Sequence, residues 1–377
     1  MTLSKPLETT RDTSLAGWLR LTLIPGLGGE SQRRLLSAFG LPENIFSLRR
    51  SELRRVVGDK TIDLLLGTDN AARVDAALDW TRIPGRSLLT LADPLYPRAL
   101  LNIPDPPVLL YILGKPELLG RKALAIVGSR RPTPQGARDA ENFAAALTEA
   151  GLLVVSGMAL GIDAAAHRGA LRAQGGTIAF IGTGIDRVYP ARNKDLAIEI
   201  ATAGAIVSEF PMGTPAAASN FPRRNRLISG IAAGVLVVEA TTESGSLITA
   251  RLAAEQGREV CAIPGSIHSP QSRGCHWLIR QGAKLVETAQ DVLVEIGEFS
   301  LSASRPEAAP VQRTADGPPD PLVALLDLMG FDPCGLDDLL VRARLPAESL
   351  TPALLQLELE GRVASLPGGR YQRLSSQ

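Results

Sequence analysis

The sequence predicts an α/β fold with a Rossmann-like parallel sheet at its centre, a helical module before it and a winged-helix module after it. Short apolar segments alternate with helix-length segments between residues 121 and 297. Near-continuous apolar strands between helices are typical of a parallel sheet that is covered on both faces. The expected strands are residues 122–127, 152–155, 177–181, 205–207, 235–238, 259–263 and 284–286. The expected helices of this region are residues 135–150, 162–174, 193–203, 246–256, 272–280 and 289–296.

A chain of 377 residues is long enough for two or three domains. We place a helical module at residues 1–84 and an extended Rossmann-like domain at residues 85–298. Within the latter, residues 85–118 are rich in proline and are expected to form an extended connector packed onto the sheet. A flexible linker is expected at residues 299–320, because serine, alanine and proline dominate there. Residues 321–377 form the last domain.

The two terminal modules have recognisable local patterns. In the first, a glycine-rich turn over residues 25–29 precedes an amphipathic segment, which is typical of a helix-hairpin-helix or sterile-alpha-like module. Such hairpins either bind the DNA backbone or serve as packing units, and both readings stay open. In the last, three helical segments precede a hairpin whose turn is Pro367-Gly368-Gly369, which is a winged-helix pattern. Its acidic residues outnumber its basic ones by seven to five, so a protein contact is as well supported as DNA binding.

Composition excludes several classes of protein. The net charge is +1, so global basicity gives no argument for nucleic-acid binding. Three cysteines without a paired framework fit a reducing cytoplasm, and no apolar run is long enough to span a membrane. The G-x-G-x-x-G dinucleotide fingerprint is not met, because Arg187 stands where the third glycine of Gly182-Thr183-Gly184 belongs. We expect no cofactor, no metal site and no catalytic residues.

Residues 220–229 carry the strongest functional signal. Arg223, Arg224 and Arg226 surround Asn225, and Phe221-Pro222 precedes them. A residue before proline is pushed out of the helical region, so we expect an extended entry and then a helix with these cations in its first turn. Cations at a helix N-terminus are locally unfavourable, and a bound polyanion would compensate them. Phe221 offers a face on which a base could stack.

Several glycine-rich loops follow the carboxyl ends of the expected strands. They are Gly128-Ser129-Arg130, the segment from Ser156-Gly157 to Gly161 and Asp163, Gly182-Thr183-Gly184, and the segment from Glu239 to Ser244-Gly245-Ser246. Ligands of open α/β sheets bind at this edge, where glycines allow close approach and helix starts supply N–H donors. Several such loops beside Arg130 and the arginine cluster predict a polyanion site.

These motifs in this order resemble the DprA (Smf) DNA-processing family. The resemblance rests on the loops above, on residues 221–228, on residues 244–250 and on Ala262-Ile263-Pro264-Gly265-Ser266. It implies a single-stranded DNA-binding protein that protects DNA and helps to load a RecA-type recombinase during natural transformation and recombination. It also implies a homodimer and no established catalytic activity. Many members have a lysine three residues before the motif phenylalanine, where this chain has Ala218, and Arg223 could replace that contact.

The resemblance implies a defined set of DNA-binding residues at the sheet edge. Arg130 would take a backbone phosphate, and Phe221 would stack on a base. Arg224 and Arg226 would supply charge, and Asn225 would add a hydrogen bond to the ligand. The full predicted set is Gly128, Ser129, Arg130, Ser156, Gly157, Gly161, Phe221, Arg223, Arg224, Asn225, Arg226, Ser244, Gly245 and Ser246.

Two other functions remain as alternatives. The central domain also resembles, more distantly, the Rossmann-like phosphoribohydrolases, whose P-G-G-x-G-T-x-x-E loop supplies a catalytic glutamate. Here residues 242–250 have no acidic residue after the glycine, which disfavours that function. Asp163 and Glu239 could act as acid or base, but carboxylates in such loops more often orient arginines or cap helices. The third alternative is an interaction scaffold in which the arginines pair internally with carboxylates.

Overall fold

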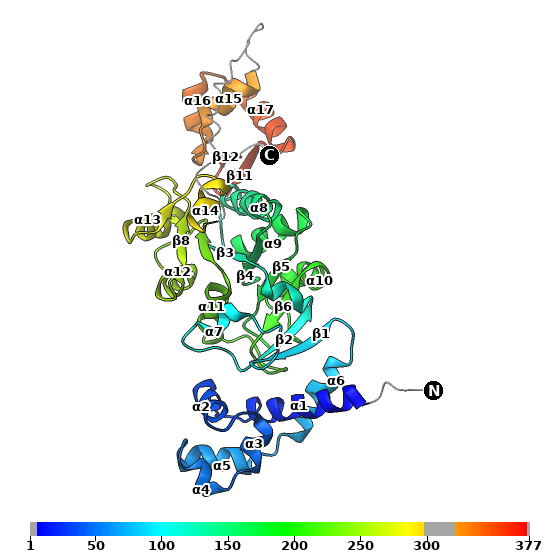
Figure 1. Ribbon diagram of the computed structural model, residues 1–377. Helices are drawn as coiled ribbons and strands as arrows, with labels where there is room; N and C mark the ends of the chain where they lie inside the picture. Colours follow the sequence, from blue (N-terminus) through cyan, green and yellow to red (C-terminus); the bar gives the residue numbers. More distant parts are fainter. Residues whose placement is uncertain (1–5, 298–320, 375–377) are drawn as a thin grey trace.

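The computed structural model describes residues 6–297 and 321–374 of the chain (Figure 1). The expected linker at residues 299–320 therefore lies outside the described residues. Among the helices that are described, none has the length and apolar character needed to cross a membrane.

Within its described residues, which start at residue 6, the first module has six helices. They are α1 (Pro6–Thr22), α2 (Gly29–Phe39), α3 (Pro42–Ser47), α4 (Arg50–Leu53), α5 (Asp59–Gly67) and α6 (Ala71–Thr81). Leu21, Leu35, Ile45 and Ile62 form part of its own buried core. The module also packs onto the sheet, because Trp80 meets Tyr111 edge to face with ring centroids 5.9 Å apart.

A nine-stranded sheet forms the centre of the molecule, and the order of its strands is β1-β2-β6-β5-β4-β3-β7-β8-β9. The strands are β1 (Arg86–Thr90), β2 (Leu109–Gly114), β3 (Ala123–Val127), β4 (Leu153–Ser156), β5 (Thr177–Phe180), β6 (Ala205–Ser208), β7 (Gly234–Val237), β8 (Glu259–Ala262) and β9 (Lys284–Leu285). The seven strands from β3 to β9 are parallel. In the segment expected to be only a connector, β1 and β2 add to the sheet as antiparallel strands. Free strand edges invite such pairing.

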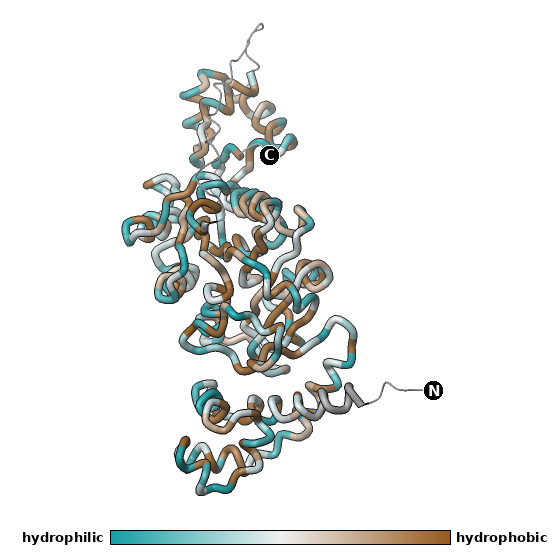
Figure 2. Tube along the Cα trace, in the orientation of Figure 1, coloured by the Kyte–Doolittle hydropathy of each residue, from teal (hydrophilic) through white to brown (hydrophobic). Residues whose placement is uncertain are grey.

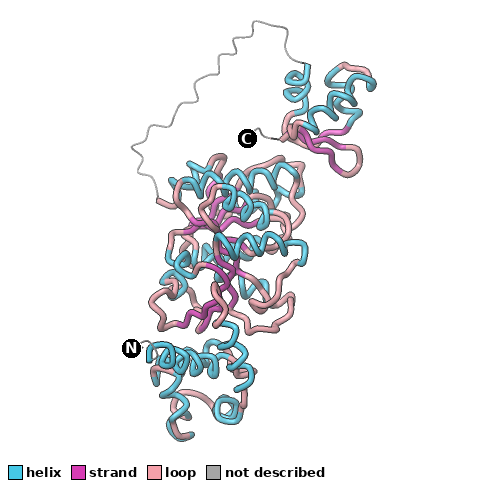
Figure 3. Tube along the Cα trace, turned by 90° about the vertical axis from the view of Figure 1, so that its right-hand side faces the viewer, coloured by secondary structure: helices cyan, strands magenta, loops and turns pink. Residues whose placement is uncertain are grey.

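Helices cover both faces of the sheet, which runs through the middle of the domain in Figure 3. One face carries α8 (Pro134–Glu149), α9 (Ile162–Arg172), α10 (Lys194–Ala203) and α14 (Ala289–Glu295). The other carries α7 (Arg98–Leu101), α11 (Asn220–Ile231), α12 (Ser246–Glu255) and α13 (Arg273–Arg280). The strands themselves are the most continuously apolar segments of the fold (Figure 2). Their burial on both sides explains why the sequence shows no polar alternation there.

The strand order places a topological switch point between β3 and β7. Successive strands after β3 extend the sheet in one direction as far as β6, and the chain then crosses back to β7, beside β3. The loops after β3 and β7 therefore lead to helices on opposite faces of the sheet. Crevices that bind ligands form at such points, outside the carboxyl ends of the strands.

The last module has the predicted winged-helix arrangement. It contains α15 (Pro321–Met329), β10 (Cys334–Gly335), α16 (Leu336–Ala343), α17 (Ala347–Leu359), β11 (Val363–Leu366) and β12 (Arg370–Arg373). The turn between β11 and β12 is the predicted Pro367-Gly368-Gly369. Arg138 on α8 donates a hydrogen bond of 3.0 Å to the carbonyl of Gly361, which links this module to the central domain.

Candidate nucleic-acid interface

The arginine-rich segment forms the start of α11, but its entry is not extended. The helix begins at Asn220, so Phe221 and Pro222 lie in its first turn, and Ser219 before them already has a helical backbone (φ −67°, ψ −23°). The expectation of an extended entry was therefore wrong. Proline is tolerated in a first turn because its missing N–H would have no partner there. As a result, the position of the Phe221 side chain is set by the first turn of α11.

A groove of about 840 Å³ lies at the switch point. The loops after β3 and β7 form two of its walls, and the first turns of α11 form a third. Of the predicted site residues, those that line the groove are Gly128, Ser129, Arg130, Phe221, Arg224, Asn225, Ser244, Gly245 and Ser246. The structure thus brings three separate sequence motifs together at one edge. Ala218 also lines the groove.

An aromatic pair stands in the groove beside an exposed arginine. The Arg130 guanidinium carbon is 5.4 Å from the centroid of the Phe221 ring, which is within cation–π range. The Tyr189 ring lies 5.7 Å from Phe221, centroid to centroid, at an interplanar angle of 36°. Phe221 itself packs against Gly182, where an added Cβ would be 3.0 Å from the ring. The loop after β5 therefore supports the aromatic ring.

Tyr189 is a groove residue that the sequence analysis missed. It is 46% exposed, which is high for a tyrosine beside another ring. A usable signal was present in the sequence, because Tyr189 stands between Arg187 and Arg192 in the loop after a strand at the ligand-binding edge.

Arg224 forms the buried floor of the groove and is only 4% exposed. Its guanidinium lies directly over Gly157, where an alanine Cβ would be 1.4 Å from Nη1. Burial lowers the pKa of Arg224 to about 10, and the nearby charge of Asp163 opposes that shift. Burial also raises the pKa of Asp163, although the N–H groups of Gly157 and Ala159 donate to its Oδ2 at 3.1 and 3.3 Å.

The electrostatics of this floor favour an anion. The Arg224 Nε has no hydrogen-bond partner among the described residues. A guanidinium that is buried and incompletely bonded gains most from a ligand that supplies a charged acceptor. Because Arg130 is close enough to lower the pKa of Arg224 further, two cations meet in this groove.

The remaining glycines and serines of the predicted set have distinct positions. Ser244 and Ser246, at the start of α12, share a hydrogen bond of 2.7 Å between their hydroxyls on the groove wall. Ser156 is fully buried and donates to the carbonyl of Ile126 at 2.6 Å, so it faces the core. Gly161 has φ +80°, and a Cβ there would be 2.3 Å from the carbonyl oxygen of Ser129. Gly161 and Ser156 therefore shape the loops behind the groove.

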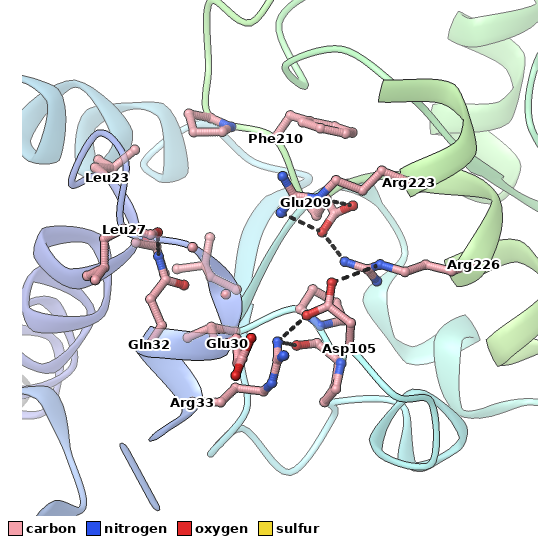
Figure 4. Close-up of a pocket in the computed structure, with 18 of the residues that line it drawn as sticks. Leu23, Leu27, Glu30, Gln32, Arg33, Asp105, Glu209, Phe210, Arg223 and Arg226 are labelled. Carbon is pink, nitrogen blue, oxygen red and sulfur yellow. Dashed lines mark hydrogen bonds and ion pairs between the residues drawn. The ribbon is translucent and has the colours of Figure 1, made fainter. Parts of the chain in front are cut away.

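Arg223 and Arg226 do not line the groove. They project from another face of α11 into a second cavity of about 620 Å³, shown in Figure 4. There Arg226 pairs with Glu209 and, at 3.3 Å, with Asp105, which in turn pairs with Arg33 of α2. Successive helical residues are about 100° apart, so Arg223 and Arg226 lie on the same face of α11 and Arg224 lies on a different one. The arginine cluster is thus divided between two sites.

Two side chains that could serve catalysis, Glu239 and His167, have partners inside the fold. The two carboxylate oxygens of Glu239 accept hydrogen bonds from the N–H and the hydroxyl of Thr133, at 2.8 and 2.6 Å, at the start of α8. His167 is fully buried, and its Nδ1 lies 2.8 Å from the Thr177 hydroxyl. Over the described ranges, no three His, Cys, Asp or Glu side chains are placed to hold a metal ion.

Fold and groove together define an α/β protein with a cationic, aromatic-lined crevice at the switch point of its sheet. The family model described as DNA recombination-mediator protein A matches residues 87–297, and that of the DprA winged helix domain matches residues 306–369. The chain therefore belongs to the DprA (Smf) family.

Individual relatives agree with this assignment. The Protein Smf of Escherichia coli is 38% identical over 369 residues, which are 95% of each chain. The X-ray structure of DNA processing protein A from Streptococcus pneumoniae is similar with a TM-score of 0.65 and 38% identity, over 74% of this chain and 97% of that one. DNA processing protein A from Helicobacter pylori, whose structure concerns its single-stranded DNA binding mode, is similar with a TM-score of 0.51 and 32% identity, over 55% and 94%.

Proposed function

We propose that this protein binds single-stranded DNA in the groove at the switch point and acts through that binding in natural transformation and recombination. The observation that carries the proposal is the pairing of Phe221 and Tyr189 beside Arg130 and Arg224 in one groove. Stacking faces next to cations are the common chemistry of single-strand binding. The Helicobacter pylori relative, with its single-stranded DNA binding mode, supports the same conclusion.

Each groove residue has a proposed role. Bases stack on Phe221, and Arg130 contacts a backbone phosphate from the exposed rim. Arg224 attracts a second phosphate from the floor. Asn225 and the hydroxyls of Ser244 and Ser246 supply hydrogen bonds to the backbone or to base edges. Arg226 is outside this set, because its guanidinium is held by Glu209 and Asp105.

Further parts of the proposal follow from the family. We propose that the protein acts without catalysis, in the cytoplasm, as a homodimer that helps to load a RecA-type recombinase. Light scattering of the purified chain tests the dimer, since a monomer mass at all concentrations would contradict it. Strand exchange by a recombinase, with the DNA first covered by single-strand-binding protein, tests the loading activity.

Replacing Arg130 with alanine should weaken single-stranded DNA binding about ten-fold or more, because a charged hydrogen bond to phosphate is lost. The slope of log affinity against log salt should become shallower by about 0.7, the value for one phosphate on a single strand. Fluorescence anisotropy of labelled oligo-dT over a salt series measures both quantities. The matched control is Arg121→Ala, an exposed arginine that precedes β3 at the opposite edge of the sheet.

Competition completes this experiment. Unlabelled single strand should displace the probe, whereas matched duplex and mononucleotide should not at the same nucleotide concentration. A salt slope near zero for the wild type would remove the electrostatic basis of the proposal. Equal competition by mononucleotide, together with release of base from it, would instead favour a nucleotide-handling enzyme.

A further inference from the structure

The loop between β5 and α10 carries a group of cations beside the groove. Arg187, Arg192 and Lys194 are exposed, and Tyr189 stands among them. The loop follows the carboxyl end of β5, so it lies at the same edge of the sheet as the groove. None of the predicted site residues belongs to this segment.

The backbone of this loop is fixed by internal hydrogen bonds. The Thr183 hydroxyl donates to the carbonyl of Arg187 at 2.8 Å. Asn193 is buried, and its Nδ2 donates to the carbonyl of Met158 at 2.9 Å, in the loop that also contains Gly157. Asp186 accepts from the N–H of Gly213 at 2.8 Å. Side chains that project from such a held loop are presented in a defined place, which lowers the entropy cost of binding.

Tyr189 connects the loop to the groove. Its ring lines the groove and lies 5.7 Å from that of Phe221. Arg187 is two residues before it and Arg192 three residues after it, so their Cα atoms lie within about 8 and 11 Å of that of Tyr189. Both guanidinium groups can therefore reach the backbone of a strand that leaves the groove past Tyr189.

The charges of the loop are not neutralised by ion pairs. Arg187, Arg192 and Lys194 have no ion-pair partner within the described ranges, although Asp186 and Asp195 are nearby in the chain. The side chain of Asp186 already accepts the N–H of Gly213. A local surplus of positive charge stands out in a chain whose net charge is only +1. A charged surface of this kind next to an aromatic ring suits nucleic acid.

We propose that residues 187–194 form a second segment of the DNA site, which binds the nucleotides adjacent to those in the groove. Tyr189 stacks on a base at the junction, and Arg187 and Arg192 contact the following phosphates. The ligand is a single strand that is longer than the groove itself. This inference rests on the proposed single-stranded DNA binding and extends its footprint.

A length series of oligo-dT tests the inference with the full chain. A probe of about four nucleotides occupies the groove, and a probe of about fifteen also covers the loop, within the range of known single-strand sites. For Arg187→Ala/Arg192→Ala, we expect the long probe to bind about ten-fold more weakly, with a salt slope shallower by about 1.4, since two phosphates at about 0.7 each are lost. The short probe should bind as it does to the wild type.

Two further variants isolate the aromatic ring and the charge. Tyr189→Ala should weaken the long probe about five-fold or more, while Tyr189→Phe keeps the stacking face and should bind like the wild type. Arg168→Ala/Arg172→Ala removes the same charge from α9 and should leave both probes unaffected. Circular dichroism confirms that each variant is folded.

The outcomes separate this inference from the function on which it rests. If the double arginine variant binds both probes like the wild type, or loses both equally, residues 187–194 are not a separate segment. If Tyr189→Phe is as weak as Tyr189→Ala, the tyrosine does not act through its ring. If the wild type binds neither probe, the proposed function itself fails, and the length dependence falls with it.

Discussion

Replacing Gly157 with alanine should remove most single-stranded DNA binding and destabilise the protein by about 3–5 kcal/mol. The added Cβ would lie 1.4 Å from Nη1 of Arg224, so the guanidinium has to leave its place. Asp163 would then stay buried without the nearby positive charge of Arg224, and leaving a buried charge uncompensated costs about this much. The groove would also lose the cation on its floor, which accounts for about a ten-fold or larger loss of affinity.

Urea unfolding measures the stability, and oligo-dT anisotropy measures the affinity. The matched control is Gly120→Ala, because a Cβ at Gly120 meets nothing within 4 Å and Gly120 precedes β3, at the opposite edge of the sheet from the groove. The destabilised variant has to be folded when it is assayed, so binding is measured at a temperature well below the onset of its unfolding. A Gly157→Ala variant with wild-type stability and affinity would show that Arg224 is not held over this glycine.

The position of the groove follows from local sequence, and this is why it could be predicted. Each strand from β3 to β8 appears within one or two residues of its expected place, because a largely buried strand is a short apolar run in the sequence. Once parallel strands alternate with helices, their carboxyl ends have to meet at one edge. The loops beginning at Gly128 and at Ser244 were therefore assigned to one groove without a structure.

Long-range pairings could not be predicted in this way. β1 and β2 are short segments between prolines, and they become strands only because β6 offers an unpaired edge. Likewise, Tyr189 meets Phe221 only after the sheet has brought the loop after β5 next to the first turn of α11. No local pattern encodes either partner, so both features were missed.

The division of the arginine cluster was partly predictable. Helical periodicity alone separates Arg223 and Arg226 from Arg224, once the helix is known to begin at Asn220. From the sequence we placed these arginines in a helix but treated them as one cluster and did not separate them by helical face. The partners of Arg226 could not be foreseen, because Glu209 and Asp105 come from two other segments.

That division leads to the second large effect: Arg226→Ala should destabilise the protein by about 3–5 kcal/mol at neutral pH and leave single-stranded DNA binding nearly unchanged. The Glu209 side chain is only 2% exposed and pairs with Arg226, so removing the arginine leaves a buried carboxylate without its main partner. The Arg226 guanidinium lines the second cavity and not the groove, so the DNA contacts remain.

The destabilisation should depend on pH, and its sign follows from Glu209. Burial raises the pKa of this carboxyl group, and Arg226 is the strongest influence that lowers it. In Arg226→Ala, the pKa of Glu209 in the folded state rises further above its value in the unfolded chain. A group of this kind loses its stabilising contribution as the pH rises through the folded-state pKa. The loss of unfolding free energy in Arg226→Ala, relative to the wild type, should therefore be largest at high pH. It should become smaller as the pH falls and Glu209 takes up a proton.

Urea unfolding of the wild type and of Arg226→Ala at about pH 8 and about pH 5 measures this difference. Arg223→Ala is the matched control, because Arg223 is 53% exposed and lies 3.4 Å from the same carboxylate. An exposed partner of this kind contributes about 1 kcal/mol at most. If Arg226→Ala instead keeps its stability and loses affinity for oligo-dT, its guanidinium turns from Glu209 to the DNA. The two faces of α11 would then act as one DNA-binding surface.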